Sequence, residues 1–108
     1  MALVLATLTV YQEKREGSNP MDKKCDRYAE ITRKVARSNG ATLVDLRSVY
    51  RAYLRNQNAE LRVDGGLNYL STGVLTYDSV HPGANGNGLL ADHISRGIHD
   101  ALNKVGNR

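Results

Sequence analysis

An apolar run near the start of the chain limits the choice of fold more than any other feature of the sequence. Leu3–Val10 reads Leu-Val-Leu-Ala-Thr-Leu-Thr-Val, with aliphatic and β-branched side chains and no polar alternation. A strand with one face in water alternates, whereas a parallel strand covered on both faces does not. The run therefore predicts a buried parallel strand, which requires a crossover segment and a second strand beside it.

The segment that follows supplies this crossover. Asn19 and Pro20 predict a helix start, with Asn19 as the cap and Pro20 as the first helical residue. Asn39-Gly40 predicts the helix end. The apolar face of this helix is predicted to hold Met21, Cys25, Tyr28, Thr32 and Val35. Residues 41–46 then predict a second short strand, so we expect a right-handed βαβ unit.

Two further helices are predicted after the second strand. Asp45 is placed to cap the first of them, which ends near Asn56. Its apolar positions are Leu46, Val49, Tyr50, Tyr53 and Leu54. The last helix follows Pro82-Gly83, with Leu90, Ile94, Gly97, Ile98, Ala101 and Val105 predicted to face inward. This order of elements predicts an α/β fold.

Length and composition are those of a single globular domain over residues 1–108. The net charge is +4, but the basic residues are scattered without interleaved aromatics, so we expect no nucleic-acid partner. The apolar first segment is too short to span a membrane and lacks a positively charged leader. We therefore expect a soluble chain with neither signal peptide nor transmembrane segment. Cys25, the only cysteine, is predicted to be a small core residue.

The candidate site residues are Asp78 and His81, which stand three positions apart on a predicted turn before the last helix. At this spacing the Asp78 carboxylate can bind one imidazole nitrogen of His81 and fix its tautomer. The other nitrogen is then available as a general base. A structural alternative is that His81 is a surface histidine that helps to begin the helix.

The stretch Asp-Ser-Val-His-Pro, followed by Gly-Asn-Gly-Leu-Leu-Ala-Asp, resembles the last conserved block of the SGNH (GDSL-type) esterases and lipases. The resemblance covers about Leu3 to Val105 and corresponds to the C-terminal half of such a hydrolase. It implies a truncated flavodoxin-like three-layer α/β/α sandwich with a short parallel sheet. It also implies acyl or acetyl ester hydrolysis, in which His81 is the general base and Asp78 orients it.

The family's nucleophile and oxyanion-hole blocks have no counterpart in the sequence. Its six serines (Ser18, Ser38, Ser48, Ser71, Ser79 and Ser95) occur in no Gly-Asp-Ser context and in no Gly-x-Ser-x-Gly elbow. Three hypotheses follow: a fragment that becomes an esterase when a partner supplies the serine, a non-catalytic self-associating module, and a weak esterase that uses His81 alone. The acyl ester is a substrate only in the first and third.

The resemblance also predicts how the chain associates. In the family's strand order, 2-1-3-4-5, the strand at Leu3–Val10 has a neighbour on both sides, and the missing half leaves one edge open. Open apolar edges promote pairing with another chain, so we expect a homodimer or higher oligomer through Leu3–Val10. We expect no metal, because Asp78 and His81 lack convergent Cys or His residues. We expect no cofactor, because Asn85–Gly88 lacks a Walker lysine.

Overall fold

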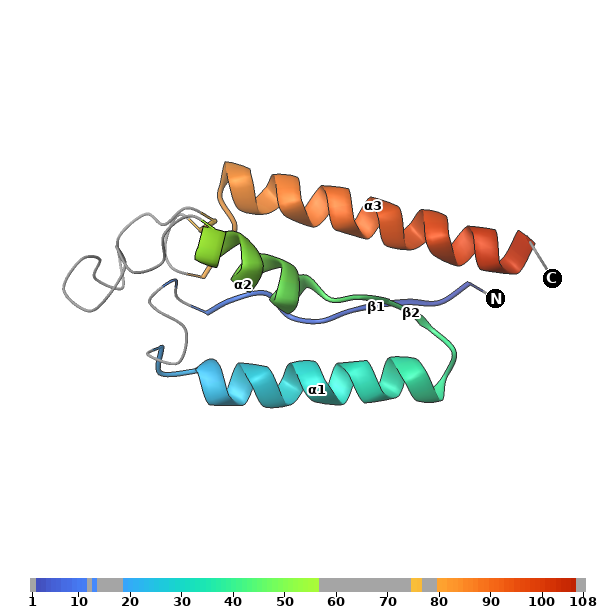
Figure 1. Cartoon of the computed structure of the whole chain (residues 1–108), viewed down its shortest axis with the longest axis horizontal. Coiled ribbons are helices and arrows are strands. Elements are labelled where there is room, and N and C mark those ends of the chain that lie inside the picture. Colours follow the sequence, from blue (N-terminus) through green and yellow to red (C-terminus); the bar gives the residue numbers. More distant parts are fainter. Residues whose placement is uncertain (1, 12, 14–18, 57–74, 77–79, 107–108) are drawn as a thin grey trace.

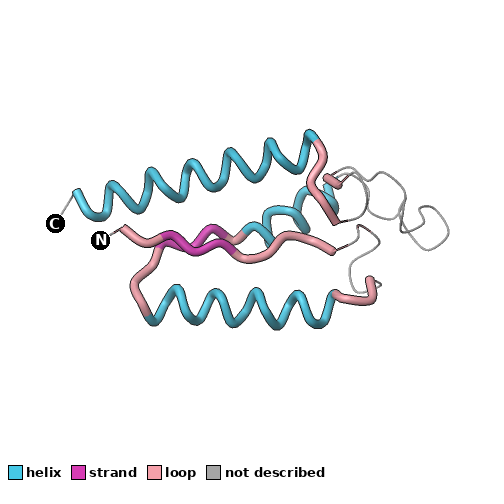
Figure 2. The backbone as a smooth tube through the Cα atoms, turned by 180° about the vertical axis from the view of Figure 1, so that it is seen from behind, coloured by secondary structure: helices cyan, strands magenta, loops and turns pink. Residues whose placement is uncertain are grey.

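The computed structural model describes residues 2–11, 13, 19–56, 75–76 and 80–106. The described part is a small α/β unit in which a two-stranded parallel sheet lies between helices (Figures 1 and 2). The elements in chain order are β1 (Val4–Ala6), α1 (Asp22–Ser38), β2 (Thr42–Val44), α2 (Leu46–Asn56) and α3 (Ala84–Gly106). In Figure 1, α1 and α3 cover opposite faces of the sheet. The predicted βαβ unit, two parallel strands joined through a helix, is thus confirmed.

Strand β1 is shorter than the predicted strand over Leu3–Val10. The three-residue ladder begins where Val4 pairs with Thr42. One backbone hydrogen bond extends it at each end: Thr42 N donates to Leu3 O, and Thr7 N donates to Val44 O. Beyond Thr7 the backbone is bound by a side chain instead: the carbonyl of Thr9 accepts a 2.7 Å hydrogen bond from the Arg47 guanidinium. At this position the side chain of Arg47, and not a neighbouring strand, binds the backbone that follows β1.

Helix α1 begins two residues later than predicted. The amide and the side chain of Asn19 both donate to the Asp22 carboxylate, at 3.3 and 3.0 Å, and Asp22 N donates back to Asn19 O. Asn19 therefore closes a turn ahead of the helix instead of capping it, and the N-cap position falls to Met21. The predicted end is confirmed: Asn39 is the C-cap, and Gly40 has a φ of 64°, which favours glycine.

The buried face of α1 is narrower than its apolar spacing predicted. Cys25 is buried as expected, together with Asp22, Ala29 and Ala36. Tyr28 and Val35, by contrast, are 54% and 45% exposed. The small residues at positions 25, 29 and 36 let the helix approach the strands closely. They therefore form the buried face of α1, and the larger side chains lie on one flank of it.

Asp45 caps helix α2, as predicted. Ser48 N donates to Asp45 Oδ1 at 3.3 Å, which is the usual cap geometry, and Val49 N donates to Asp45 O. Arg33 of α1 holds the same carboxylate with bonds of 2.8 and 3.0 Å. Burial alone would raise the pKa of Asp45, but the hydrogen bonds from Arg33 and Ser48 outweigh it and lower that pKa.

Helix α3 lies on the sheet through a glycine. A Cβ at Gly97 would stand 2.3 Å from Cγ2 of Val44, so the helix backbone approaches β2 more closely than any side chain there would allow. Ala101 is buried beside it, as predicted. The prediction was wrong for Ile98 and Val105, which are exposed. They stand on the flank of α3, since about 100° separates successive residues of a helix.

Exposed apolar side chains form two stripes, one along α1 and one along α3. They are Tyr28, Ile31 and Val35 on α1, and Ile98, Leu102 and Val105 on α3. The opposite flank of α1 carries Asp26 and Arg33, which bind α2 and its cap. The opposite flank of α3 carries Leu89, which packs against the core cluster that includes Tyr50 of α2. By helical spacing, each stripe therefore lies on the flank away from α2, and we infer that the two stripes border the outer edge of β1, which has no strand partner among the described residues. We call this the β1 side.

Candidate functional site

His81 lies in the turn that leads into α3, at the end of the molecule where both parallel strands have their carboxyl ends (Figure 1). This is the edge at which open α/β sheets usually bind ligands. The side chain of His81 is exposed. Two contacts close the turn around it: an isolated antiparallel bridge joins Thr76 to Pro82, and Gly83 N donates to Leu75 O at 2.8 Å. The imidazole is thus carried on a short closed loop.

Asp78, the other predicted site residue, lies outside the described residues. Its pairing with His81 therefore stays a prediction. The described ends of the loop, Thr76 and Pro82, are held together by the antiparallel bridge.

Glu13 holds the near end of this loop, and sequence reasoning missed it. Its side chain is buried, with the residue 6% exposed. Leu75 N donates to Oε1 at 3.0 Å, Thr76 N donates to Oε2 at 2.8 Å, and the Thr76 hydroxyl makes a short bond to Oε2. Glu13 lies in a polar stretch between the first predicted strand and the first predicted helix. No short-range pattern could have connected it with a partner more than 60 positions away.

Tyr50 of α2 holds the far end of the loop. Its hydroxyl donates to the carbonyl of Gly86, in the first turn of α3, at 2.7 Å. Burial raises the pKa of Tyr50, and the nearby negative charge of Glu13 raises it further, so the hydroxyl stays protonated as a donor. A Cβ at Gly86 would stand 2.1 Å from Leu75 O, so this position requires glycine. Tyr50 also packs with Leu54 and Leu75 in the core below the loop.

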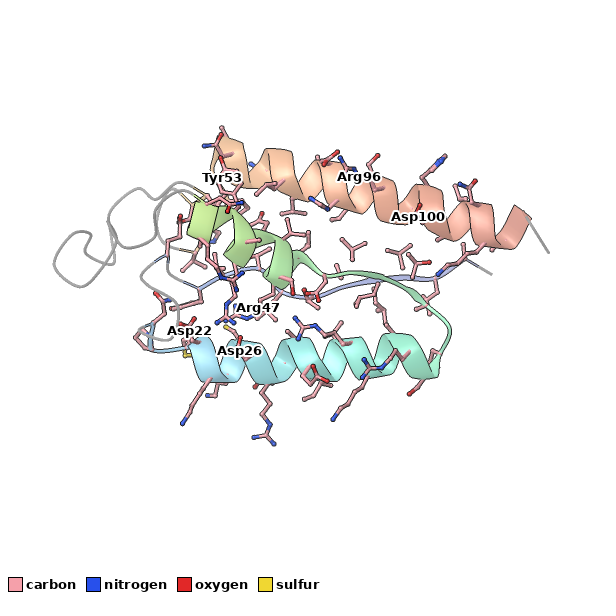
Figure 3. All side chains as sticks on the ribbon, viewed as in Figure 1. Asp22, Asp26, Arg47, Tyr53, Arg96 and Asp100 are labelled. Carbon is pink, nitrogen blue, oxygen red and sulfur yellow. The ribbon has the colours of Figure 1, made fainter. Side chains whose placement is uncertain are left out.

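A second buried charge, Arg47, joins α2 to α1 beneath the site. Arg47 is 1% exposed and donates to Asp26 at 2.7 Å and to Asp22 at 3.4 Å (Figure 3). Arg51 pairs with Asp26 at 2.9 Å. Burial opposes ionisation of Asp26, but the hydrogen bond from Arg47 and the charge of Arg51 outweigh it and lower the pKa of Asp26. In the sequence Arg47 stands next to Leu46, one of the predicted apolar positions of the helix. That spacing does not indicate that Arg47 is itself buried.

Nothing in the described part of the chain resembles a metal centre. No group of three or more His, Cys, Asp or Glu side chains stands close enough there to hold a metal ion. A surface hollow of about 500 Å³ lies at the start of α1, lined by Pro20, Met21, Lys23, Lys24 and Arg27. It does not include His81. Among the described helices, none is long and apolar enough to cross a bilayer.

Comparison with known proteins shows that this architecture is similar to part of an esterase fold. No protein-family model and no curated protein matches the sequence. Among solved structures, the acetyl xylan esterase AlAXEase superposes on 89% of this chain with a TM-score of 0.76 and 32% identity. A catalytic mutant of Axe2, an acetylxylan esterase from Geobacillus stearothermophilus, superposes on 90% with a TM-score of 0.66 and 23% identity.

The chain spans less than half of these proteins, 44% of AlAXEase and 37% of Axe2. Its three helices and two parallel strands match part of an esterase fold. The described chain is therefore a small α/β unit that is similar in structure, over about nine-tenths of its length, to part of the acetyl xylan esterases.

Proposed function

We propose that this chain is the part of an SGNH-type acetyl ester hydrolase that carries the general base. The observation that carries the proposal is the similarity to AlAXEase, with 32% identity over 89% of this chain. The position of His81 supports it, since the turn before α3 lies at the carboxyl ends of the strands. The predicted pattern of Asp78 three residues ahead of His81 supports it independently.

In this proposal the serine comes from a polypeptide segment outside residues 1–108. The imidazole nitrogen of His81 that does not bind Asp78 takes the proton of that hydroxyl as the oxygen attacks the ester carbonyl. His81 then returns the proton to the departing alcohol, which leaves an acetyl-serine. Water, activated by the same nitrogen, releases acetate and restores the serine. Asp78 orients the ring and stabilises the imidazolium. The oxyanion donors belong to the same outside segment.

The substrate class follows from the proteins that the chain resembles. Their names specify acetyl xylan and acetyl-xylooligosaccharides. We therefore infer acetyl esters on a sugar backbone as the substrate. The exposure of His81 fits a bulky substrate that approaches from solvent.

The test is hydrolysis of p-nitrophenyl acetate and acetylated xylan by the chain alone and by a mixture. The mixture contains the part of AlAXEase that the superposition leaves uncovered, and size-exclusion chromatography establishes whether the two polypeptides assemble. We expect hydrolysis in the assembled mixture that His81→Ala abolishes. His99→Ala is the matched control, because His99 is an exposed histidine of α3. Hydrolysis that His81→Ala leaves unchanged would rule out the assigned base.

A second candidate function is a non-catalytic module that associates with itself. The β1 side favours it, since the outer edge of β1 and two apolar stripes lie together there. Under this alternative, neither the chain nor the mixture hydrolyses esters, and light scattering detects dimers or larger assemblies. A third hypothesis, weak hydrolysis by His81 alone, requires activity in the unmixed chain that His81→Ala removes.

A further inference from the structure

The carboxylate of Glu13 binds two consecutive residues of the chain. Leu75 N donates to Oε1, and the amide and the hydroxyl of Thr76 donate to Oε2. Peptide N–H groups are rigid donors, so two consecutive ones bound to one carboxylate fix the plane of the peptide between them. The orientation of the peptide between Leu75 and Thr76 is therefore set by Glu13.

The orientation of this peptide also affects the two residues that follow His81. Thr76, whose amide Glu13 holds, pairs with Pro82 in the bridge that closes the loop. Leu75, whose amide Glu13 also holds, accepts from Gly83 N. Pro82 and Gly83 directly follow His81 in the chain. A displacement of the Glu13 carboxylate therefore moves both contacts that locate the imidazole.

The backbone segment that Glu13 binds is held rigidly by packing. Leu75 is fully buried against Tyr50 and Leu54, and Gly86 seats α3 against the Leu75 carbonyl. The loop is thus held at three points: by packing at Leu75, by the Tyr50 bond at the start of α3, and by Glu13. Of the three contacts, the one made by the Glu13 carboxylate binds the peptide N–H groups of Leu75 and Thr76 and so orients them.

We propose that Glu13 is a positioning residue for His81: its buried carboxylate fixes the backbone of Leu75 and Thr76 so that the turn presents the imidazole in one orientation. This inference rests on the proposed function for its catalytic meaning. In this proposal Glu13 takes no direct part in the reaction. Its effect passes through the loop, so it alters the placement of the base and leaves substrate binding alone.

Three variants grade the loss of this contact. Glu13→Gln keeps one accepting oxygen, Thr76→Val removes the hydroxyl donor and keeps both amides, and Glu13→Ala removes every acceptor. The control is Glu30→Gln, an exposed acidic residue of α1 that pairs with Arg33 and Arg37. Circular dichroism establishes that each variant keeps its fold. Should Glu13→Ala fail to fold, the two milder variants carry the test.

Two readouts do not depend on ester hydrolysis. The first is amide hydrogen exchange at Leu75 and Thr76, which we expect to accelerate about tenfold in Glu13→Gln and further in Glu13→Ala. The second is the imidazole NMR signals of His81, which we expect to shift or broaden while those of His99 stay unchanged. Unaltered exchange and unaltered His81 signals in folded Glu13→Gln and Thr76→Val would overturn the proposal.

Activity of the assembled mixture separates this inference from the proposed function. We expect the variants to lower kcat with little change in KM, because the base is misplaced while substrate contacts remain. An inactive mixture whose His81 signals still respond to Glu13 supports the positioning role and counts against the proposed function alone. Lowered activity with unchanged His81 signals would overturn the positioning role.

Discussion

The two sides of the sheet are built from different interactions. On the side of β2, Arg47 and Arg51 of α2 bind Asp22 and Asp26 of α1, and Arg33 reaches across to Asp45. On the β1 side, two apolar stripes flank an edge that has no strand partner in the described chain. Helices α1 and α3 contribute to both sides, each with its two flanks composed differently.

The difference lies in how each side satisfies its side chains. Buried charges are tolerated where they are paired, as around Arg47 on the β2 side. Adjacent exposed apolar side chains, as on the β1 side, are typical of surfaces that another polypeptide covers. The four predictions below test this contrast from the largest expected effect to the smallest.

Arg47→Met should have the largest effect, on the β2 side. The substitution removes the Arg47 guanidinium from the Asp22 carboxylate and from the Thr9 carbonyl. Breaking a buried pair from one side costs about 3–5 kcal/mol of unfolding free energy. Urea denaturation measures the loss. The control is Arg37→Ala, whose side chain is exposed and forms a 3.8 Å pair with Glu30, and it should change stability by less than about 1 kcal/mol. An equal loss of unfolding free energy in the two variants would show that the buried ion pairs of Arg47 stabilise the fold no more than an exposed pair does.

Gly97→Ala should come next, because it lifts α3 from the sheet and so affects both sides. Its methyl group would meet Val44 at 2.3 Å, an overlap that costs about 1–3 kcal/mol. Gly88→Ala is the control, since no atom lies within 4 Å of a Cβ there and alanine favours a helix. Thermal unfolding should therefore show opposite shifts of Tm. A stabilising Gly97→Ala would contradict the close seating of α3.

Acid should weaken the β2 side selectively. The folded-state pKa values of Asp26 and Asp45 lie below their ordinary value, mainly through Arg47 and Arg33 working against burial. Their contribution is fully present above the unfolded pKa of about 3.9 and is lost as the pH falls through the lower folded values. Unfolding free energy should thus fall as the pH drops below about 4, and Asp45→Asn should flatten this slope. An unchanged slope in Asp45→Asn would argue against a contribution from that pair.

Leu102→Lys should have the smallest effect on folding, on the β1 side. Leu102 is 59% exposed, so its replacement should alter unfolding free energy by no more than about 0.5 kcal/mol. We propose that a second copy pairs along Leu3–Val10 and covers the stripes, so the variant should shift light scattering towards monomer. Ala52→Lys, exposed on α2, is the control. A wild-type chain that is monomeric at high concentration would remove the proposal.

The parts of this fold that follow local rules could be predicted from the sequence. The crossover between strands, the Asp45 cap and the apolar face of α2 all depend on residues close together in the chain. Glu13 and Arg47 could not be predicted, because apolar periodicity assigns charged side chains to solvent and their partners are remote. The inward placement of Tyr28 and Ile98 was wrong, because the spacing of apolar residues does not distinguish the face of a helix that packs on the sheet from an exposed flank beside it.

The contact between Glu13 and Thr76 also bears on the order of folding. It joins residues 63 positions apart, whereas Thr7 and Asp45, which fasten the strands to α2, are 38 apart. Closing a longer loop costs more chain entropy, and contacts between remote residues slow folding. The strands and their crossover should therefore form first, and the turn that bears His81 should be fixed last. Pulse-labelled hydrogen exchange would show the Thr76 amide gaining protection after that of Thr7.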